Sequence, residues 1–143
     1  MLGSFLHTLS YRIFSADQKV WAQVEAGPAK GIWLELNSRT GQNYRLGETE
    51  KTCQTIVAER LRLGDVFYDL GANIGLFSRL AARTAGPTGE VFSFESDGQI
   101  AERLRRNAAR NGFSNITVVE MGVWSASGAL NFTSADSSSP NRV

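Results

Sequence analysis

The stretch from Val66 to Gly75 constrains the fold of this chain more than any other feature. A short apolar run ends at Asp69 and passes at once into a loop with Gly71 and Gly75 near its two ends. The residues that follow Gly75 have the apolar spacing of a helix. A strand, a tight glycine loop and a helix start form a ligand-binding corner in open α/β sheets, where ligands lie beyond the carboxyl ends of the strands. The stretch therefore predicts an α/β sheet with a binding site at this edge.

Strands and helices alternate after this corner. Strands are predicted at Val66–Leu70, Val91–Glu95 and Ile116–Glu120, with a helix from Asp97 to about Arg110. This order is typical of a parallel sheet with right-handed crossovers. The first strand is apolar almost throughout, so we expect both of its faces to be covered. One more strand is predicted at Ala129–Thr133; the resulting unpaired edge favours a fragment, or a sheet completed by strands from elsewhere.

The N-terminal part, residues 1–47, is predicted to form a small antiparallel element. The expected strands are Lys19–Glu25, Ile32–Asn37 and Gln42–Leu46, after a short helix at 3–14. The second strand alternates apolar and polar residues, which indicates a half-buried strand. Residues 48–143 would form the α/β part, and the two parts together a single domain.

The α/β part begins with a predicted helix from Glu50 to Leu63. Its buried stripe is expected to hold Cys53, Ile56, Val57 and Leu61.

Composition excludes several classes of function. The chain has 143 residues and a formal charge of +1, which gives no reason to expect nucleic acid or an acidic surface as partner. One cysteine and one histidine make a zinc site improbable, and no metal is expected. The apolar N-terminal stretch is too short to span a bilayer. We therefore expect a cytoplasmic protein without a membrane partner; the sequence does not predict its oligomeric state.

The loop residues fit a particular ligand. Gly71 and Gly75 allow close backbone approach on either side of Ala72 and Asn73, and asparagine tolerates a positive φ. The N–H groups at the start of the next helix would suit a carboxylate. Asp69, at the strand end, could bind an ammonium group directly or through water. Together these groups match the methionine end of S-adenosylmethionine.

A second acid completes the predicted site. Glu95 ends the neighbouring strand about 20 residues after Gly75, the spacing at which a carboxylate accepts hydrogen bonds from both hydroxyls of a ribose. Ser96 follows it in the same loop. Met121, after the third strand, could pack on the adenine ring.

A dinucleotide is the main alternative ligand. It requires glycine at the first, third and sixth loop positions, which here are Gly71, Asn73 and Leu76. The two side chains would crowd a pyrophosphate, so an NAD-dependent oxidoreductase is disfavoured.

The same residues resemble the FkbM family of S-adenosylmethionine-dependent methyltransferases. The resemblance runs from Gly47 to Phe132, and it implies a Rossmann-like class I methyltransferase sheet, apparently truncated, and methylation of hydroxyl groups on small molecules or sugars. Ser96 stands where the family usually has proline. The family's later Lys-x-Asp-x-Glu-Gly motif is absent, so no catalytic base is assigned, and a non-catalytic or truncated remnant stays an alternative. The segments that carry the resemblance are Gly47–Glu50, Asp69–Gly75, Phe92–Glu95, Arg103–Asn107 and Asn111–Gly112.

Overall fold

The structure is a computed structural model that describes residues 18–126 and 128. The predicted helix at 3–14 and the predicted strand at Ala129–Thr133 lie outside these residues. No described helix is both long enough and apolar enough to cross a bilayer.

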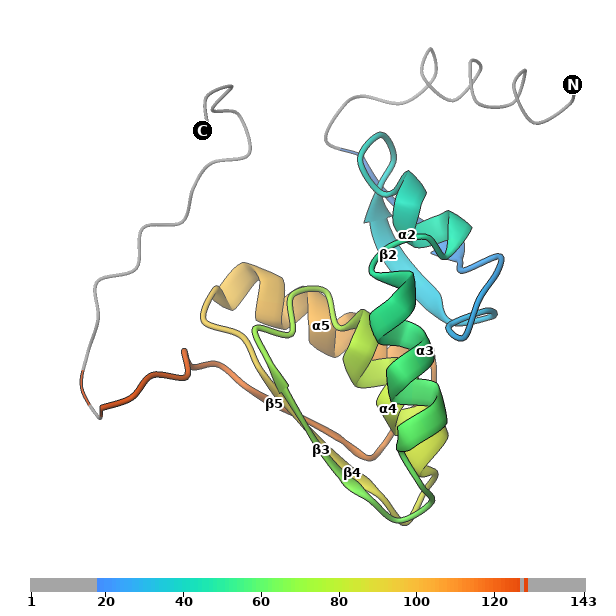
Figure 1. Cartoon of the computed structure of the whole chain (residues 1–143). Coiled ribbons are helices and arrows are strands. Elements are labelled where there is room, and N and C mark those ends of the chain that lie inside the picture. Colours follow the sequence, from blue (N-terminus) through green and yellow to red (C-terminus); the bar gives the residue numbers. More distant parts are fainter. Residues whose placement is uncertain (1–17, 127, 129–143) are drawn as a thin grey trace, which may run out of the picture.

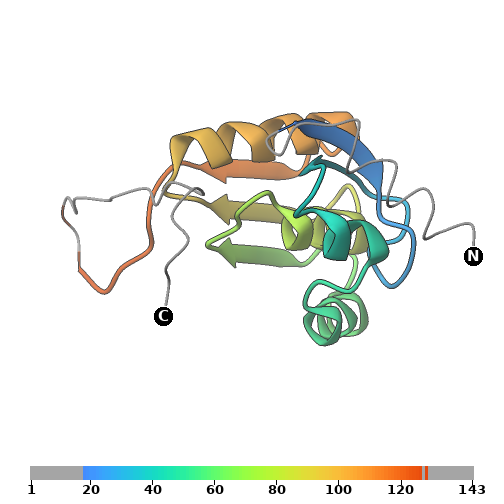
Figure 2. The ribbon, with the colours of Figure 1, turned by 90° about the horizontal axis from the view of Figure 1, so that it is seen from above.

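The main sheet is parallel, as predicted. Strands β3 (Val66–Leu70), β4 (Glu90–Phe94) and β5 (Ile116–Val119) lie in the order β3-β4-β5 and point the same way (Figure 2). Helix α4 (Leu76–Ala85) connects the first two strands, and α5 (Gly98–Arg110) connects the second pair. The carboxyl ends of all three strands therefore meet at one edge of the sheet.

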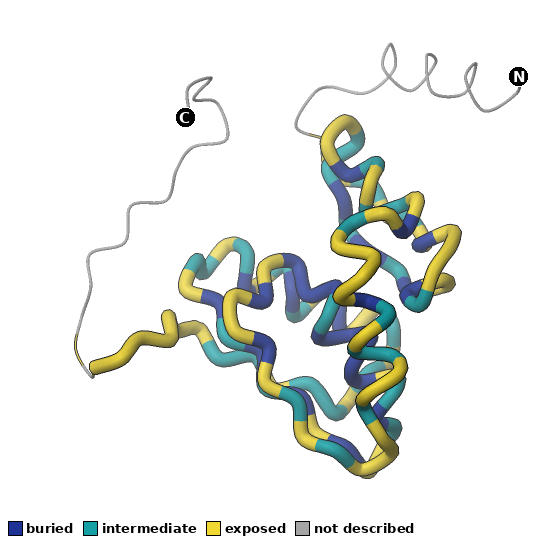
Figure 3. Tube along the Cα trace, viewed as in Figure 1, coloured by how far each residue is buried: buried dark blue, intermediate teal, exposed yellow. Residues whose placement is uncertain are grey.

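Only one face of this sheet is covered within the described chain, so the prediction of a strand buried on both faces is wrong for β3. The helices lie on one side of the strands (Figure 1), and residues on the other side are exposed (Figure 3). Val66 is 48% exposed, and Tyr68 and Leu70 are each 60% exposed. The Tyr68 ring stacks on Phe92 with the ring centres 5.4 Å apart. The apolar run at Val66–Leu70 therefore corresponds to an apolar outer face of the sheet that no described element covers.

The N-terminal part contains a two-stranded antiparallel sheet. Strand β1 (Lys19–Gln23) pairs with β2 (Trp33–Asn37), and Leu34 and Leu36 of β2 are buried, as the alternation predicted. The third predicted strand is wrong, because Gln42–Leu46 forms the short helix α2. Five residues are too few for periodicity to separate strand from helix.

Helix α3 (Lys51–Arg60) is confirmed, but its predicted buried stripe is wrong in part. Cys53 is exposed and Ile56 is 53% exposed, whereas Gln54 is fully buried. Gln54 Nε2 donates to the Thr49 carbonyl oxygen at 2.7 Å, whereas Gln54 Oε1 has no partner among the described residues. The inward face instead runs through Gln54, Val57 and Leu61.

Side chains of α5 and of Asn111, which follows it, attach the small sheet to the main one. The Asn111 amide exchanges two hydrogen bonds of 2.8 Å with the backbone of Trp33, and Asn107 Oδ1 accepts from Glu35 N at 2.7 Å. Arg103 donates to the Glu35 carbonyl oxygen. These groups take the place of a neighbouring strand along the free edge of β2, so the N-terminal part is held beside the glycine loop.

Candidate functional site

The glycine loop has the backbone that its sequence predicts. Gly71, Asn73 and Gly75 have φ of 76°, 49° and 80°. A Cβ on Gly75 would lie 2.8 Å from Leu104 Cγ, so only glycine fits where the loop meets α5. A Cβ on Gly71 would meet no atom within 4 Å. Gly71 therefore borders open space, on the side where a ligand can approach the backbone.

The N–H groups of the loop are bonded within the protein. Those of Gly71 and Ala72 both donate to the Phe94 carbonyl oxygen, at 3.0 and 2.9 Å. Asn73 Oδ1 accepts from Ile74 N at 2.7 Å, and Gly75 N donates to the Ala72 carbonyl oxygen at 2.8 Å. Gly75, before helix α4, provides no side-chain cap, and the Asp69 carboxylate accepts a hydrogen bond from the Ser78 backbone N–H of the first turn.

Glu95 lies directly against this loop. Its side chain is largely buried; Oε2 accepts from Asn73 N at 2.8 Å, and Oε1 accepts from Asp97 N at 2.9 Å. A carboxylate has about four acceptor sites, so two of them stay available for other donors. The structure thus brings Glu95 and the glycine loop together at one point, as the predicted site requires.

Asp69 lies beneath the loop and points toward α4. Its Oδ2 accepts from Ser78 Oγ at 2.5 Å, and Ser93 Oγ bonds to Ser78 Oγ at 2.8 Å. Burial raises the pKa of the Asp69 carboxyl, and hydrogen bonds from Ser78 and the charge of Arg79 counteract that rise. Sequence reasoning missed both serines; the available signal was a small polar residue next to apolar ones, Ser78 after Phe77 in α4 and Ser93 between two phenylalanines in β4.

Arg79 is a fully buried cation that the sequence analysis also missed. Its Nη1 donates to the Ile74 carbonyl oxygen at 2.9 Å, and Nε and Nη2 have no partner among the described residues. Burial lowers the pKa of Arg79 to about 9, and the charge of Asp69 opposes that change. Arg79 therefore remains a cation at neutral pH, close to the buried carboxylate of Asp69.

The other two predicted residues lie at the tips of β4 and β5. Ser96 is exposed, and its Cβ would lie 3.7 Å from a Cβ on Gly122. Met121, next to Gly122, is 59% exposed and belongs to neither core cluster of the described residues. All the predicted site residues thus lie at the carboxyl edge of the sheet. Their contacts with a cofactor stay a prediction. No cluster of three potential metal ligands occurs in the described part of the chain.

The buried Asp69 charge predicts an unusual pH dependence of stability. Because its folded-state pKa is raised above 3.8, the folded protein holds the proton more tightly than the unfolded chain. Stability contributed by this group therefore falls as the pH rises from 3.8 through the raised pKa. We expect Asp69→Asn to abolish this slope and to melt no lower than the wild type at pH 7, measured by thermal unfolding between pH 4 and 7. Asp65→Asn, outside the site, should keep the slope; an unchanged slope in Asp69→Asn would refute the assignment.

Comparison with known proteins adds an independent observation. Over 79 residues the chain is 33% identical to the protein-L-isoaspartate O-methyltransferase of Ignicoccus hospitalis, a match that covers 55% of this chain and 37% of that protein. It is 35% identical over 108 residues to the AMB antimetabolite synthetase AmbE of Pseudomonas aeruginosa, covering 66% of this chain and 5% of that protein. The chain therefore spans much less than half the length of these curated relatives. No protein-family model matches it.

A solved structure supports the fold. The structure of P. horikoshii TYW2 in complex with MeSAdo aligns with a TM-score of 0.59 and 16% identity, over 77% of this chain and 38% of that one. The chain therefore has a Rossmann-like α/β fold, which it shares with that structure. The comparisons leave the acceptor open, because the isoaspartate relative is named for a protein acceptor. They do not support the expectation that nucleic acid is excluded.

Proposed function

We propose that this chain is the cofactor-binding part of an S-adenosylmethionine-dependent methyltransferase that acts on a hydroxyl group. The single observation that carries the proposal is the contact of Glu95 with the glycine loop. An acid at the tip of β4 lies 2.8 Å from the loop backbone, beside the open space at Gly71. A ligand that spans the two strand tips would place a ribose at Glu95 and an amino-acid end above the loop.

The bound cofactor would supply a methyl group on a positively charged sulfur. The protein's part is to hold that group in line with the acceptor oxygen, and such positioning is worth about 7–11 kcal/mol in favourable cases. In the proposed arrangement Glu95 holds the ribose, the first turn of α4 faces the carboxylate, and Asp69 compensates the ammonium charge. We also propose that the chain belongs to the FkbM family, because its segments Asp69–Gly75 and Phe92–Glu95 resemble those of that family.

Isothermal titration with S-adenosylhomocysteine and with NAD tests the cofactor. We expect the first to bind with a micromolar dissociation constant and NAD at least tenfold more weakly, because Asn73 and Leu76 occupy positions that a pyrophosphate loop needs as glycine. Tighter binding of NAD would exclude the methyltransferase proposal.

The uncovered face of β3 favours a second candidate, a binding module without turnover. Its exposed residues Val66, Tyr68 and Leu70 show that the described sheet lacks a layer on one side. A methyl-transfer assay on the 143-residue chain separates the two functions, since turnover by this chain alone would refute the binding module.

A further inference from the structure

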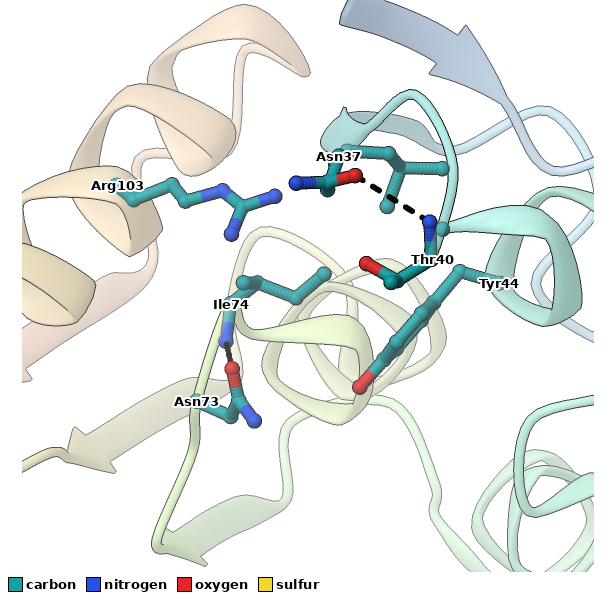
Figure 4. Close-up of a pocket in the computed structure, with 8 residues that line it drawn as sticks. Asn37, Thr40, Tyr44, Asn73, Ile74 and Arg103 are labelled. Atoms are coloured by element: carbon teal, nitrogen blue, oxygen red, sulfur yellow. Dashed lines mark hydrogen bonds between the residues drawn. The ribbon is translucent and has the colours of Figure 1, made fainter. Parts of the chain in front are cut away.

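A small cavity lies where the N-terminal part meets the glycine loop, and it shares only Asn73 with the predicted cofactor-binding residues. Its volume is about 120 Å³, and Asn37, Thr40, Tyr44, Asn73 and Arg103 supply its polar lining (Figure 4). This space has room for several waters or for one group of the size of a carboxylate or phosphate. The cavity therefore suits a single polar group of a larger ligand.

Two hydrogen-bond donors face each other across this cavity. Asn37 Oδ1 accepts from the backbone N–H groups of Arg39 and Thr40, at 3.0 and 3.3 Å. This fixes the amide so that its NH₂ group is directed toward the Arg103 guanidinium (Figure 4). Neither group can accept a hydrogen bond from the other. An oxygen acceptor between them would satisfy both.

The charges at the Arg103 side of the cavity favour an anion, whereas the negative charge of Glu50 acts on Tyr44. Arg103 and Arg106 share the carboxylate of Glu35, with nitrogen–oxygen distances of 3.6 and 2.7 Å, so this cluster carries one excess positive charge. None of the described residues that line the cavity is acidic. Tyr44 stays protonated, because burial and the nearby charge of Glu50 raise its hydroxyl pKa above 10.0. Its hydroxyl group can therefore donate a hydrogen bond.

We propose that this cavity binds an oxyanion, a carboxylate or phosphate carried by the methyl acceptor, between Asn37 and Arg103. This inference rests on the proposed function, since it assigns the cavity to the acceptor. Asn73 belongs both to the cavity and to the glycine loop. An anion bound here would hold the rest of the acceptor beside the cofactor.

Nuclear magnetic resonance can detect the binding through the side chains themselves. The ¹⁵N-labelled protein, saturated with S-adenosylhomocysteine, is titrated with inorganic phosphate at constant ionic strength. We expect the Asn37 side-chain amide and the Arg103 Nε signals to shift and to saturate together. The titration is repeated without S-adenosylhomocysteine, so a failure of cofactor binding is seen separately from a failure of phosphate binding.

The decisive variant is Asn37→Asp. It keeps an oxygen for the turn N–H groups of Arg39 and Thr40, but it replaces the donor by a negative charge next to Arg103. We expect phosphate binding to weaken at least tenfold and S-adenosylhomocysteine binding to change less than twofold. Arg105→Gln, on the exposed side of the same helix, is the matched control and should leave phosphate binding unchanged.

Three outcomes would overturn the proposal. The first is the absence of a saturable shift, and the second is equal phosphate affinity in Asn37→Asp and wild type. The third concerns the source of the anion. If Asn37→Asp weakens binding of S-adenosylhomocysteine but not of 5′-methylthioadenosine, which lacks the carboxylate, the cavity belongs to the cofactor rather than to the acceptor.

Discussion

Glu95→Gln is expected to weaken S-adenosylhomocysteine binding by about 5- to 150-fold. The carboxylate accepts from Asn73 N and Asp97 N, and the proposed ribose contact uses its remaining acceptor sites. In the variant, an NH₂ group replaces one carboxylate oxygen and cannot accept a hydrogen bond, so at least one of these donors loses its acceptor. Each buried donor left without an acceptor costs about 1–3 kcal/mol. Isothermal titration of the variant and the wild type measures the change, with 1.4 kcal/mol for each factor of ten.

Two comparisons separate ribose binding from support of the loop. Glu90→Gln, at the exposed start of the same strand, should bind like the wild type. A 2′-deoxy analogue of the ligand should bind more weakly than the parent ligand to the wild type, but nearly as well as the parent to Glu95→Gln, because the partner of the missing hydroxyl is already gone. If the 2′-deoxy substitution costs the same in both proteins, Glu95 only supports the loop.

The sequence predicted those parts of the site that local geometry determines. The positive φ of Asn73, the two flanking glycines and the position of Glu95 at the next strand tip all follow from short segments with few backbone solutions. The side-chain networks were not predictable in this way. Arg79 and Ser78 stand on a helix whose pattern shows only which face is apolar, and their buried partners come from the loop and the neighbouring strands.

The errors in the N-terminal part have a related cause. Helix α2 was predicted as a strand because five residues carry too little periodicity, and the neighbours that decide its conformation are distant in sequence. Likewise Gln54 lies on the inward face of α3, where its Nε2 donates to the carbonyl oxygens of Gly47 and Thr49. Neither secondary-structure propensity nor the periodicity of apolar residues takes account of such contacts.

The largest expected loss of stability is in Asn107→Ala, because Asn107 connects segments that are far apart in the sequence. Asn107 is fully buried; its Oδ1 accepts from Glu35 N, 72 positions away, and its Nδ2 donates to the Ile74 carbonyl oxygen at 3.0 Å. The substitution leaves Glu35 N unpaired and opens a small void, whereas Ile74 keeps its bond from Arg79. We expect a loss of about 2–4 kcal/mol in the free energy of unfolding, measured by urea denaturation. Alanine favours helix more than asparagine does, so propensity works against this loss.

The same substitution tests whether the N-terminal part supports the geometry of the site. Because Asn107 bonds both to β2 and to the loop residue Ile74, its loss should also weaken S-adenosylhomocysteine binding severalfold at a temperature where the variant remains folded. Asn43→Ala, on the exposed surface of α2, is the matched control and should change neither stability nor affinity by more than experimental error. If Asn107→Ala lowers stability while the affinity of the folded protein is unchanged, Asn107 supports the fold alone, and the glycine loop keeps its geometry without the N-terminal sheet.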